Sequence, residues 1–211
     1  MRARRATPDL ETLVDLFYDN LRDLGEFTEV DEAEMPEVDR GLLAHDEHMT
    51  VAVEAFHGCP VDVRVLEVHT TPIHYSRKIL LTRQSDGAVV QYGIVRLNLD
   101  YLGADVRREI ESQQTPLGRI LIEHNVLRTV RLLTLWKIEP GEELRKLFGL
   151  QRPGSPVEAV DGVPGAAGTD AEAESGKGTL PAASTCYGRT ALIYCNGIPA
   201  VELLEIVTPA A

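Results

Sequence analysis

The sequence predicts an α+β fold in which a single six-stranded antiparallel sheet carries helices packed on one face. Six segments alternate in hydrophobicity or are rich in β-branched residues, as strands are. Hairpins or short helices join these segments without a regular β-α-β-α order, so a parallel sheet is not expected. The 211 residues suit one domain, residues 1–211, with a sizeable core.

The N-terminal part, residues 1–41, is predicted to contain one helix followed by an acidic loop. Apolar residues recur at three- and four-residue spacings from Pro8 to Leu24, which is typical of an amphipathic helix. Gly25 is expected to end this helix. Acidic residues dominate the stretch 26–39 that follows, which favours a loop.

The remaining elements are predicted from periodicity and from residues that begin and end helices. Strands are expected over residues 61–68, 75–83, 88–99, 126–138, 187–195 and 200–207. Further helices are expected over residues 42–56, 101–113, 115–124 and 140–148. Asn196-Gly197 is the strongest short hairpin signal in the chain and joins the last two strands.

The segment 151–184 has a different composition from the rest of the chain. Of its 34 residues, 17 are Gly, Pro or Ala, and none is aromatic. Such a segment cannot bury enough apolar surface to offset the entropy of ordering it. We therefore expect a flexible insertion within the domain, because two strands still follow it.

The overall charge limits the expected partners. The formal net charge is −12, which argues against nucleic acid or an anionic membrane as the main partner. A local arginine can still attract a small anionic ligand. No apolar run approaches the ~20 residues that span a bilayer, and no signal peptide is recognisable. We expect a cytoplasmic protein that is a monomer or a small homo-oligomer.

The common cofactor and catalytic motifs are absent from the sequence. No GxGxxG, P-loop, HExxH or GxSxG pattern occurs. His45 and His48 lie three residues apart with Asp46 beside them, a spacing that can present metal ligands on one face of a helix. Solvated polar residues near a helix start explain the same pattern more simply. Neither a metal nor a cofactor is predicted.

Glu205 and Arg77 are charged residues in apolar rows of predicted strands. Because strand side chains alternate between faces, Glu205 shares a face with Val201, Leu203 and Val207, and Arg77 shares one with Tyr75, Ile79 and Leu81. Burying either charge is costly unless it is paired. An acid and a guanidinium of this kind suggest a site that binds an anion and moves a proton. A structural ion pair, or two side chains at a sheet edge that extend to solvent, also explain the pattern.

Four segments between residues 42 and 208 together resemble the chorismate pyruvate-lyase family, in its divergent branch. In chain order they are Leu42-Leu43 with an acidic residue and Met49-Thr50; Arg77-Lys78-Ile79-Leu80-Leu81; Thr115-Pro116-Leu117-Gly118-Arg119-Ile120-Leu121; and Gly197-Ile198-Pro199 followed by Glu205. Each segment alone is weak evidence for the family, whereas the order and spacing of the four segments together are fairly specific to it. The family fold is also a six-stranded antiparallel sheet flanked by helices.

The resemblance implies a lyase that converts chorismate to 4-hydroxybenzoate and pyruvate for ubiquinone or other aromatic biosynthesis, without a cofactor. By this resemblance Arg77 holds a substrate carboxylate and Glu205 is the catalytic acid or base. Met49 and Leu117 match apolar positions that pack on the ring. Alternatives are a non-catalytic aromatic-acid binding or sensor domain of the same fold, and a lyase acting on a related enol ether acid.

The chain departs from the family pattern at one position that bears on the substrate. Some family members carry a second arginine directly after a glycine on the strand that follows the hairpin. Here Gly93 is followed by Ile94, so that arginine is missing. Arg96, two residues further on, is the candidate replacement.

Overall fold

The computed structural model describes residues 9–150 and 185–209, which form one seven-stranded sheet with every neighbouring pair antiparallel. The strand order across the sheet is β1-β5-β6-β7-β4-β3-β2. The strands are β1 Gly25–Val30, β2 Val61–Thr70, β3 Tyr75–Arg83, β4 Val89–Leu97, β5 Arg128–Pro140, β6 Cys186–Cys195 and β7 Ile198–Val207. The predicted insertion at 151–184 lies outside the described residues.

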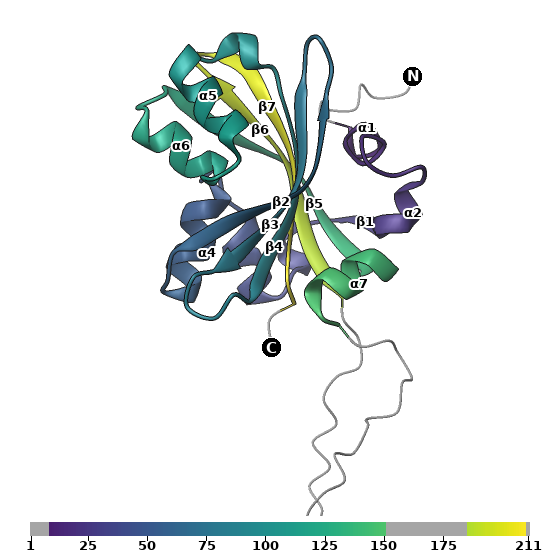
Figure 1. Cartoon of the computed structure of the whole chain (residues 1–211). Helices are drawn as coiled ribbons and strands as arrows, with labels where there is room; N and C mark the ends of the chain where they lie inside the picture. The colour runs from purple at the N-terminus through teal and green to yellow at the C-terminus, as the bar shows by residue number, and fades with distance from the viewer. Residues whose placement is uncertain (1–8, 151–184, 210–211) are drawn as a thin grey trace, which may run out of the picture.

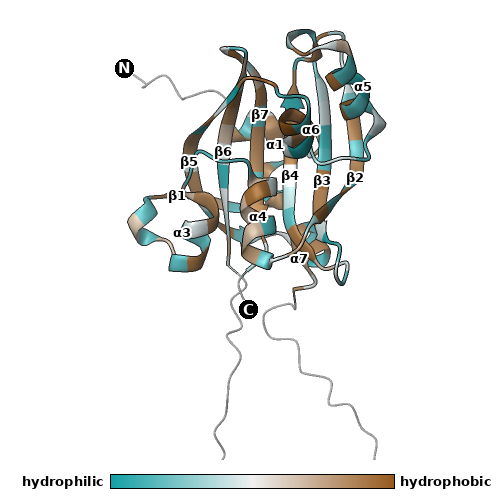
Figure 2. Ribbon diagram, turned by 90° about the vertical axis from the view of Figure 1, so that its left-hand side faces the viewer, coloured by the Kyte–Doolittle hydropathy of each residue, from teal (hydrophilic) through white to brown (hydrophobic). Residues whose placement is uncertain are grey.

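Most helices lie on one face of this sheet, as Figures 1 and 2 show. They are α3 Glu37–Leu43, α4 Met49–His57, α5 Ala104–Ser112 and α6 Leu117–Glu123. A smaller group packs against the other face and consists of α1 Leu10–Val14, α2 Leu21–Leu24 and α7 Glu142–Phe148. The predicted class, one antiparallel sheet with helices packed on one face, is confirmed for the larger group of helices, and the sheet has seven strands where six were predicted. Among the described helices, none is long and apolar enough to cross a membrane.

The seventh strand, β1, lies where an acidic loop was predicted. Its residues pair with the C-terminal half of β5, from Gly25 opposite Pro140 to Val30 opposite Leu135. Phe27 packs edge-on against Trp136 with ring centroids 6.2 Å apart. The glutamates of β1 point to solvent, because this strand is at the edge of the sheet. The acidic composition of this stretch favoured a loop, and the strand was not predicted because its partner is more than 100 residues away in sequence.

The predicted N-terminal helix is broken into two short helices, α1 and α2. The Asn20 side chain accepts a hydrogen bond from the Arg22 amide at 2.9 Å and caps α2. The six residues between the helices let the Tyr18 hydroxyl reach the Tyr92 hydroxyl, 3.0 Å away on the sheet. Contacts with the sheet thus override the continuous apolar periodicity.

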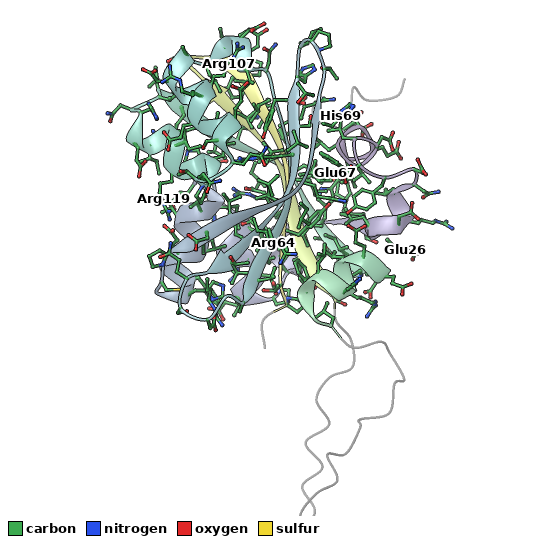
Figure 3. All side chains as sticks on the ribbon, viewed as in Figure 1. Glu26, Arg64, Glu67, His69, Arg107 and Arg119 are labelled. Carbon is green, nitrogen blue, oxygen red and sulfur yellow. The ribbon has the colours of Figure 1, made fainter. Side chains whose placement is uncertain are left out.

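The opposite edge strand, β2, is protected against pairing with another sheet. Its residues Arg64, Glu67 and His69 are exposed charged or polar side chains (Figure 3). A register shift between Val65 and Glu67 also interrupts the ladder with β3. Charges and irregularities of this kind are typical of edge strands that do not aggregate.

Candidate ligand-binding site

A small cavity lies between the middle of the sheet and the helices α4 and α6. Its volume, counted as the space open to the centre of a water molecule, is about 40 Å³. One water needs roughly 10–15 Å³ on this measure. Its lining is mostly apolar and includes Ile79, Leu81, Val95, Val130, Ile193 and Leu203. All four residues predicted for the site, Arg77, Glu205, Met49 and Leu117, line this one cavity.

The strand register explains why the cavity forms here. Gly93 of β4 lies directly between Ile79 of β3 and Glu205 of β7, so all three face the same side. Opposed residues in an antiparallel sheet have closely spaced Cβ atoms, and their side chains normally fill the space above the strands. Since glycine has no side chain, the backbone of Gly93 itself lines the cavity. A Cβ atom built there would lie 3.3 Å from Cγ1 of Ile79, so a larger residue would crowd the Ile79 side chain.

Two helices cover this open space. Met49, at the start of α4, is 2 % exposed, and Leu117, at the start of α6, is 8 % exposed. The helices can approach closely because Gly118 has no side chain. A Cβ atom at this position would lie only 2.9 Å from Oγ1 of Thr50. Arg119 of α6, labelled in Figure 3, binds Glu54 of α4 and so ties the two helices together.

Arg77 is fully buried and has no counter-ion among residues 9–150 and 185–209. Its relative exposure is 0 %, and its Nε and Nη1 atoms have no hydrogen-bond partner among the described residues. Burial lowers the pKa of the guanidinium, and the nearby Tyr75 acts in the opposite direction. Arginine nevertheless stays charged in proteins. The site therefore contains a buried positive charge with free donors, which is costly for the empty protein.

Glu205 does form an ion pair, but its partner is Arg189. Nε of Arg189 donates to a carboxylate oxygen of Glu205 at 2.8 Å, and the side chains are 0 % and 9 % exposed. The strands place the two residues directly opposite each other. The structural ion pair that the sequence left open is thus present at Glu205, whereas no ion pair joins it to Arg77 within the described chain.

The other nitrogens of Arg189 hold the loop between α3 and α4. Nη1 donates to the carbonyl oxygens of His45 at 2.8 Å and Leu43 at 3.3 Å. Nη2 donates to the carbonyl oxygen of Glu47 at 2.9 Å. These bonds explain why the helix predicted over 42–56 is divided into α3 and α4. Arg189 fixes the loop that leads into Met49.

Sequence reasoning missed Arg189 because of a β-bulge. The turn at Asn196-Gly197 has positive φ angles of 53° and 79°, as the predicted hairpin requires. A regular hairpin from this turn would place Arg189 opposite Leu204. The register shifts by one residue beyond Pro199 and brings Arg189 opposite Glu205. Proline lacks an N–H group and is common at bulges, which is the one signal that could have indicated the shift.

His48 forms a neutral part of the cavity wall. Its Nε2 atom accepts a hydrogen bond from Nε of Arg128 at 2.8 Å. Burial, with added repulsion from Arg128 and Arg189, lowers the pKa of His48 to about 4. Among residues 9–150 and 185–209, no group of three His, Cys, Asp or Glu side chains could hold a metal ion. Asp46, beside the histidines, instead accepts a hydrogen bond from the Leu132 amide.

His48 is expected to make the protein less stable in mild acid. The folded state keeps the ring neutral down to about pH 4, whereas an unfolded histidine is protonated below 6.5. Between these values the unfolded state binds more protons, so the free energy of unfolding falls as the pH is lowered. Its contribution should amount to about 2 kcal/mol between about pH 7 and 4.5.

The matched variant for this prediction is His48→Gln, which keeps an acceptor for Arg128 but does not titrate. Urea denaturation at both pH values should show that the variant loses about 2 kcal/mol less than the parent protein. Equal losses in the two proteins would mean that His48 does not titrate in this way.

Arg96 does not replace the missing arginine. It lies on the opposite face of the sheet from the cavity and forms an ion pair with Glu202. Ile94 shares that face and is 0 % exposed in the core under α1, α2 and α7. An arginine at either position would therefore point away from the cavity.

The charges that line the cavity favour an anion. Arg77 and Arg189 contribute two positive charges and Glu205 one negative charge, which leaves one positive charge. His48 is neutral at physiological pH. This local balance is opposite in sign to the net charge of −12 of the whole chain.

Comparisons with known proteins give likenesses of fold only. No family model and no curated protein matches the chain. The solved structures that resemble it include PhnF from Mycobacterium smegmatis, the effector domain of that protein, and YydK, a possible transcriptional regulator from Bacillus subtilis. Their sequence identities are 11 %, 11 % and 12 %, and their TM-scores are 0.44, 0.45 and 0.39.

The lengths of these proteins differ from that of the chain. The matched regions cover 76 %, 77 % and 70 % of the chain, and 63 %, 88 % and 58 % of PhnF, its effector domain and YydK, respectively. The chain thus spans less than two thirds of full-length PhnF. The resemblance to chorismate pyruvate-lyase has no support from sequence comparison.

The prediction of a chorismate lyase is corrected. One of the similar structures is an effector domain, another is a possible transcriptional regulator, and none of the three is described as a lyase, which contradicts the predicted enzyme and its role in aromatic biosynthesis. In the structure the Glu205 carboxylate accepts a hydrogen bond from the buried Arg189.

Proposed function

We propose that the protein binds a small aromatic carboxylic acid in this cavity and does not convert it. Arg77 would hold the carboxylate, and Met49 and Leu117 would pack on the ring. The observation that carries the proposal is the buried guanidinium of Arg77, which has no hydrogen-bond partner for Nε and Nη1 among the described residues and lies in a mostly apolar cavity. This corresponds to the non-catalytic alternative considered from the sequence, an aromatic-acid binding or sensor domain.

A carboxylate suits the free groups of Arg77. Guanidinium N–H groups form a planar fork that matches the two oxygens of a carboxylate. In a cavity from which water is largely excluded, such a bond is stronger than at the surface. An acid bound here would supply the counter-ion that Arg77 lacks among the described residues.

The apolar walls suit a flat, uncharged body. Aliphatic side chains from β3, β4, β5, β6 and β7 line the cavity, and residues at the starts of α4 and α6 complete its wall. Ligand sites of this composition bury most of a small molecule and use few polar groups to orient it.

The cytoplasmic location and the expected lack of nucleic-acid partners stay predictions.

Thermal unfolding with matched ligands tests this proposal. Benzoate should raise the melting temperature of the protein in a saturable way, whereas benzamide, which has the same ring without the charge, should have little effect. The difference between the two shifts in melting temperature measures the contribution of the carboxylate to binding. Equal stabilisation by both compounds would contradict a site built around Arg77, and so would the lack of any stabilisation by benzoate.

A second experiment tests the absence of turnover. Chorismate incubated with the purified protein should stay unchanged, because Glu205 is engaged with Arg189. Chromatography of the mixture should detect neither 4-hydroxybenzoate nor pyruvate above a protein-free control. Formation of both products in equal amounts would restore the lyase prediction.

A further inference from the structure

The cavity contains a second unpaired polar group, on Gln91. The side chain is 2 % exposed, and its carbonyl oxygen Oε1 has no hydrogen-bond partner in the described part of the chain. Buried acceptors without a donor are rare in native proteins, and each one calls for an explanation. The contact between Arg77 and a carboxylate does not involve Gln91.

The two unpaired groups lie toward opposite ends of the cavity. Arg77 is opposite Val95, and Gln91 is opposite Leu81, in the pairing of β3 with β4. Val95 and Gln91 are four residues apart on β4, which corresponds to about 13 Å between their backbones. Gly93 lies midway and leaves the floor open between the two side chains. A ligand above Gly93 can therefore contact both groups at once.

The chemistry of the two groups differs. Arg77 offers only donors and requires an acceptor such as a carboxylate. The Gln91 carbonyl oxygen requires a donor, for which a hydroxyl or amino group is suitable. Neighbouring side chains do not supply one, because Leu81 and Val207, which face Gln91 across the strands, are apolar.

We propose that Gln91 determines ligand specificity by accepting a hydrogen bond from a hydroxyl or amino group at the end of the ligand remote from its carboxylate. This inference rests on the proposed function and narrows it. The preferred ligand is a ring acid with a donor substituent, and an unsubstituted acid leaves the Gln91 oxygen unpaired. A site built to bond a hydroxyl group discriminates strongly against analogues that lack it.

Calorimetric titration of four ring acids tests the inference. Benzoate, 3-hydroxybenzoate, 4-hydroxybenzoate and terephthalate would be titrated into the parent protein, into Gln91→Met and into Gln84→Met. Methionine is close to glutamine in shape but offers no strong acceptor. Gln84 is an exposed glutamine on the turn between β3 and β4 and is the matched control. Gln91→Leu serves as a second variant without the amide.

At least one hydroxybenzoate should bind the parent protein about tenfold more tightly than benzoate does, because it satisfies the Gln91 oxygen. In Gln91→Met and Gln91→Leu the two affinities should become nearly equal, while Gln84→Met should keep the preference. Both Gln91 variants should fold, because each removes an unpaired buried acceptor.

Three results would overturn the inference. Equal affinities for benzoate and both hydroxybenzoates in the parent protein would show that no donor is recognised. A preference that persists in the Gln91 variants would place the acceptor elsewhere, for example on Glu205. Tighter binding of terephthalate than of the hydroxybenzoates would mean that an acceptor is preferred. In each case benzoate still binds, so the proposed function survives; if no acid binds at all, both fail together.

Discussion

Replacing Arg77 by methionine is expected to stabilise the empty protein and to abolish the binding of ring acids. The substitution removes a buried charge that has no partner among the described residues and fills the space with an apolar side chain of similar length. Replacing buried ionic groups by apolar residues can stabilise a protein by about 1–4 kcal/mol. Urea denaturation without ligand should show an increase of about 1–3 kcal/mol in the free energy of unfolding.

Higher stability together with lost binding in Arg77→Met would show that the charge of Arg77 serves ligand binding and does not stabilise the fold. Binding sites often retain groups that destabilise the empty protein, so removing such a group raises stability and lowers function. Arg96→Met is the matched control, because Arg96 lies on the adjacent strand, faces away from the cavity and is paired with Glu202. The control should not raise stability and should bind ligand like the parent. A loss of several kcal/mol in Arg77→Met would show that Arg77 is a structural residue.

Replacing Arg189 by methionine is expected to have the opposite effect and to destabilise the protein strongly. Glu205 would remain buried without its partner, and three carbonyl groups in the loop from Leu43 to Glu47 would lose a donor. Breaking a buried ion pair from one side costs about 3–5 kcal/mol. The free energy of unfolding, measured with urea, should fall by an amount in this range.

The double variant Arg189→Met/Glu205→Leu distinguishes the ion pair from the loop contacts. Because no charge is then left unpaired, part of the stability should return, and the double variant should be more stable than Arg189→Met alone. The loss that remains measures the three bonds to the loop. If the double variant is less stable than Arg189→Met, the ion pair is not the main contribution of Arg189.

Most of the sheet could be predicted from the sequence, because five of the six connections between its strands are hairpins or short helical segments with local signals. Asn196-Gly197 fixed the last hairpin, and alternation assigned Arg77 and Glu205 to apolar faces. Strand β1 was missed because its pairing with β5 is long-range and its composition is acidic. The break between α1 and α2 depends on contacts with the sheet that no periodicity reveals.

The sequence predicted four residues that line the cavity, but it did not predict the ion pair between Arg189 and Glu205. Parity and the family resemblance brought Arg77, Glu205, Met49 and Leu117 to one cavity. The partner of Glu205 depends on a one-residue bulge beyond Pro199, and a single sequence does not specify such a shift. The contact between Glu205 and Arg189 was not predicted for the same reason.

A calorimetric titration of 4-hydroxybenzoate into the parent protein, Arg77→Met and Arg96→Met at neutral pH tests most directly whether Arg77 is the anion site. Saturable binding at one site is expected in the parent protein and in Arg96→Met, and no detectable binding is expected in Arg77→Met. Binding of equal strength in all three proteins would show that the buried guanidinium of Arg77 is not the anion site.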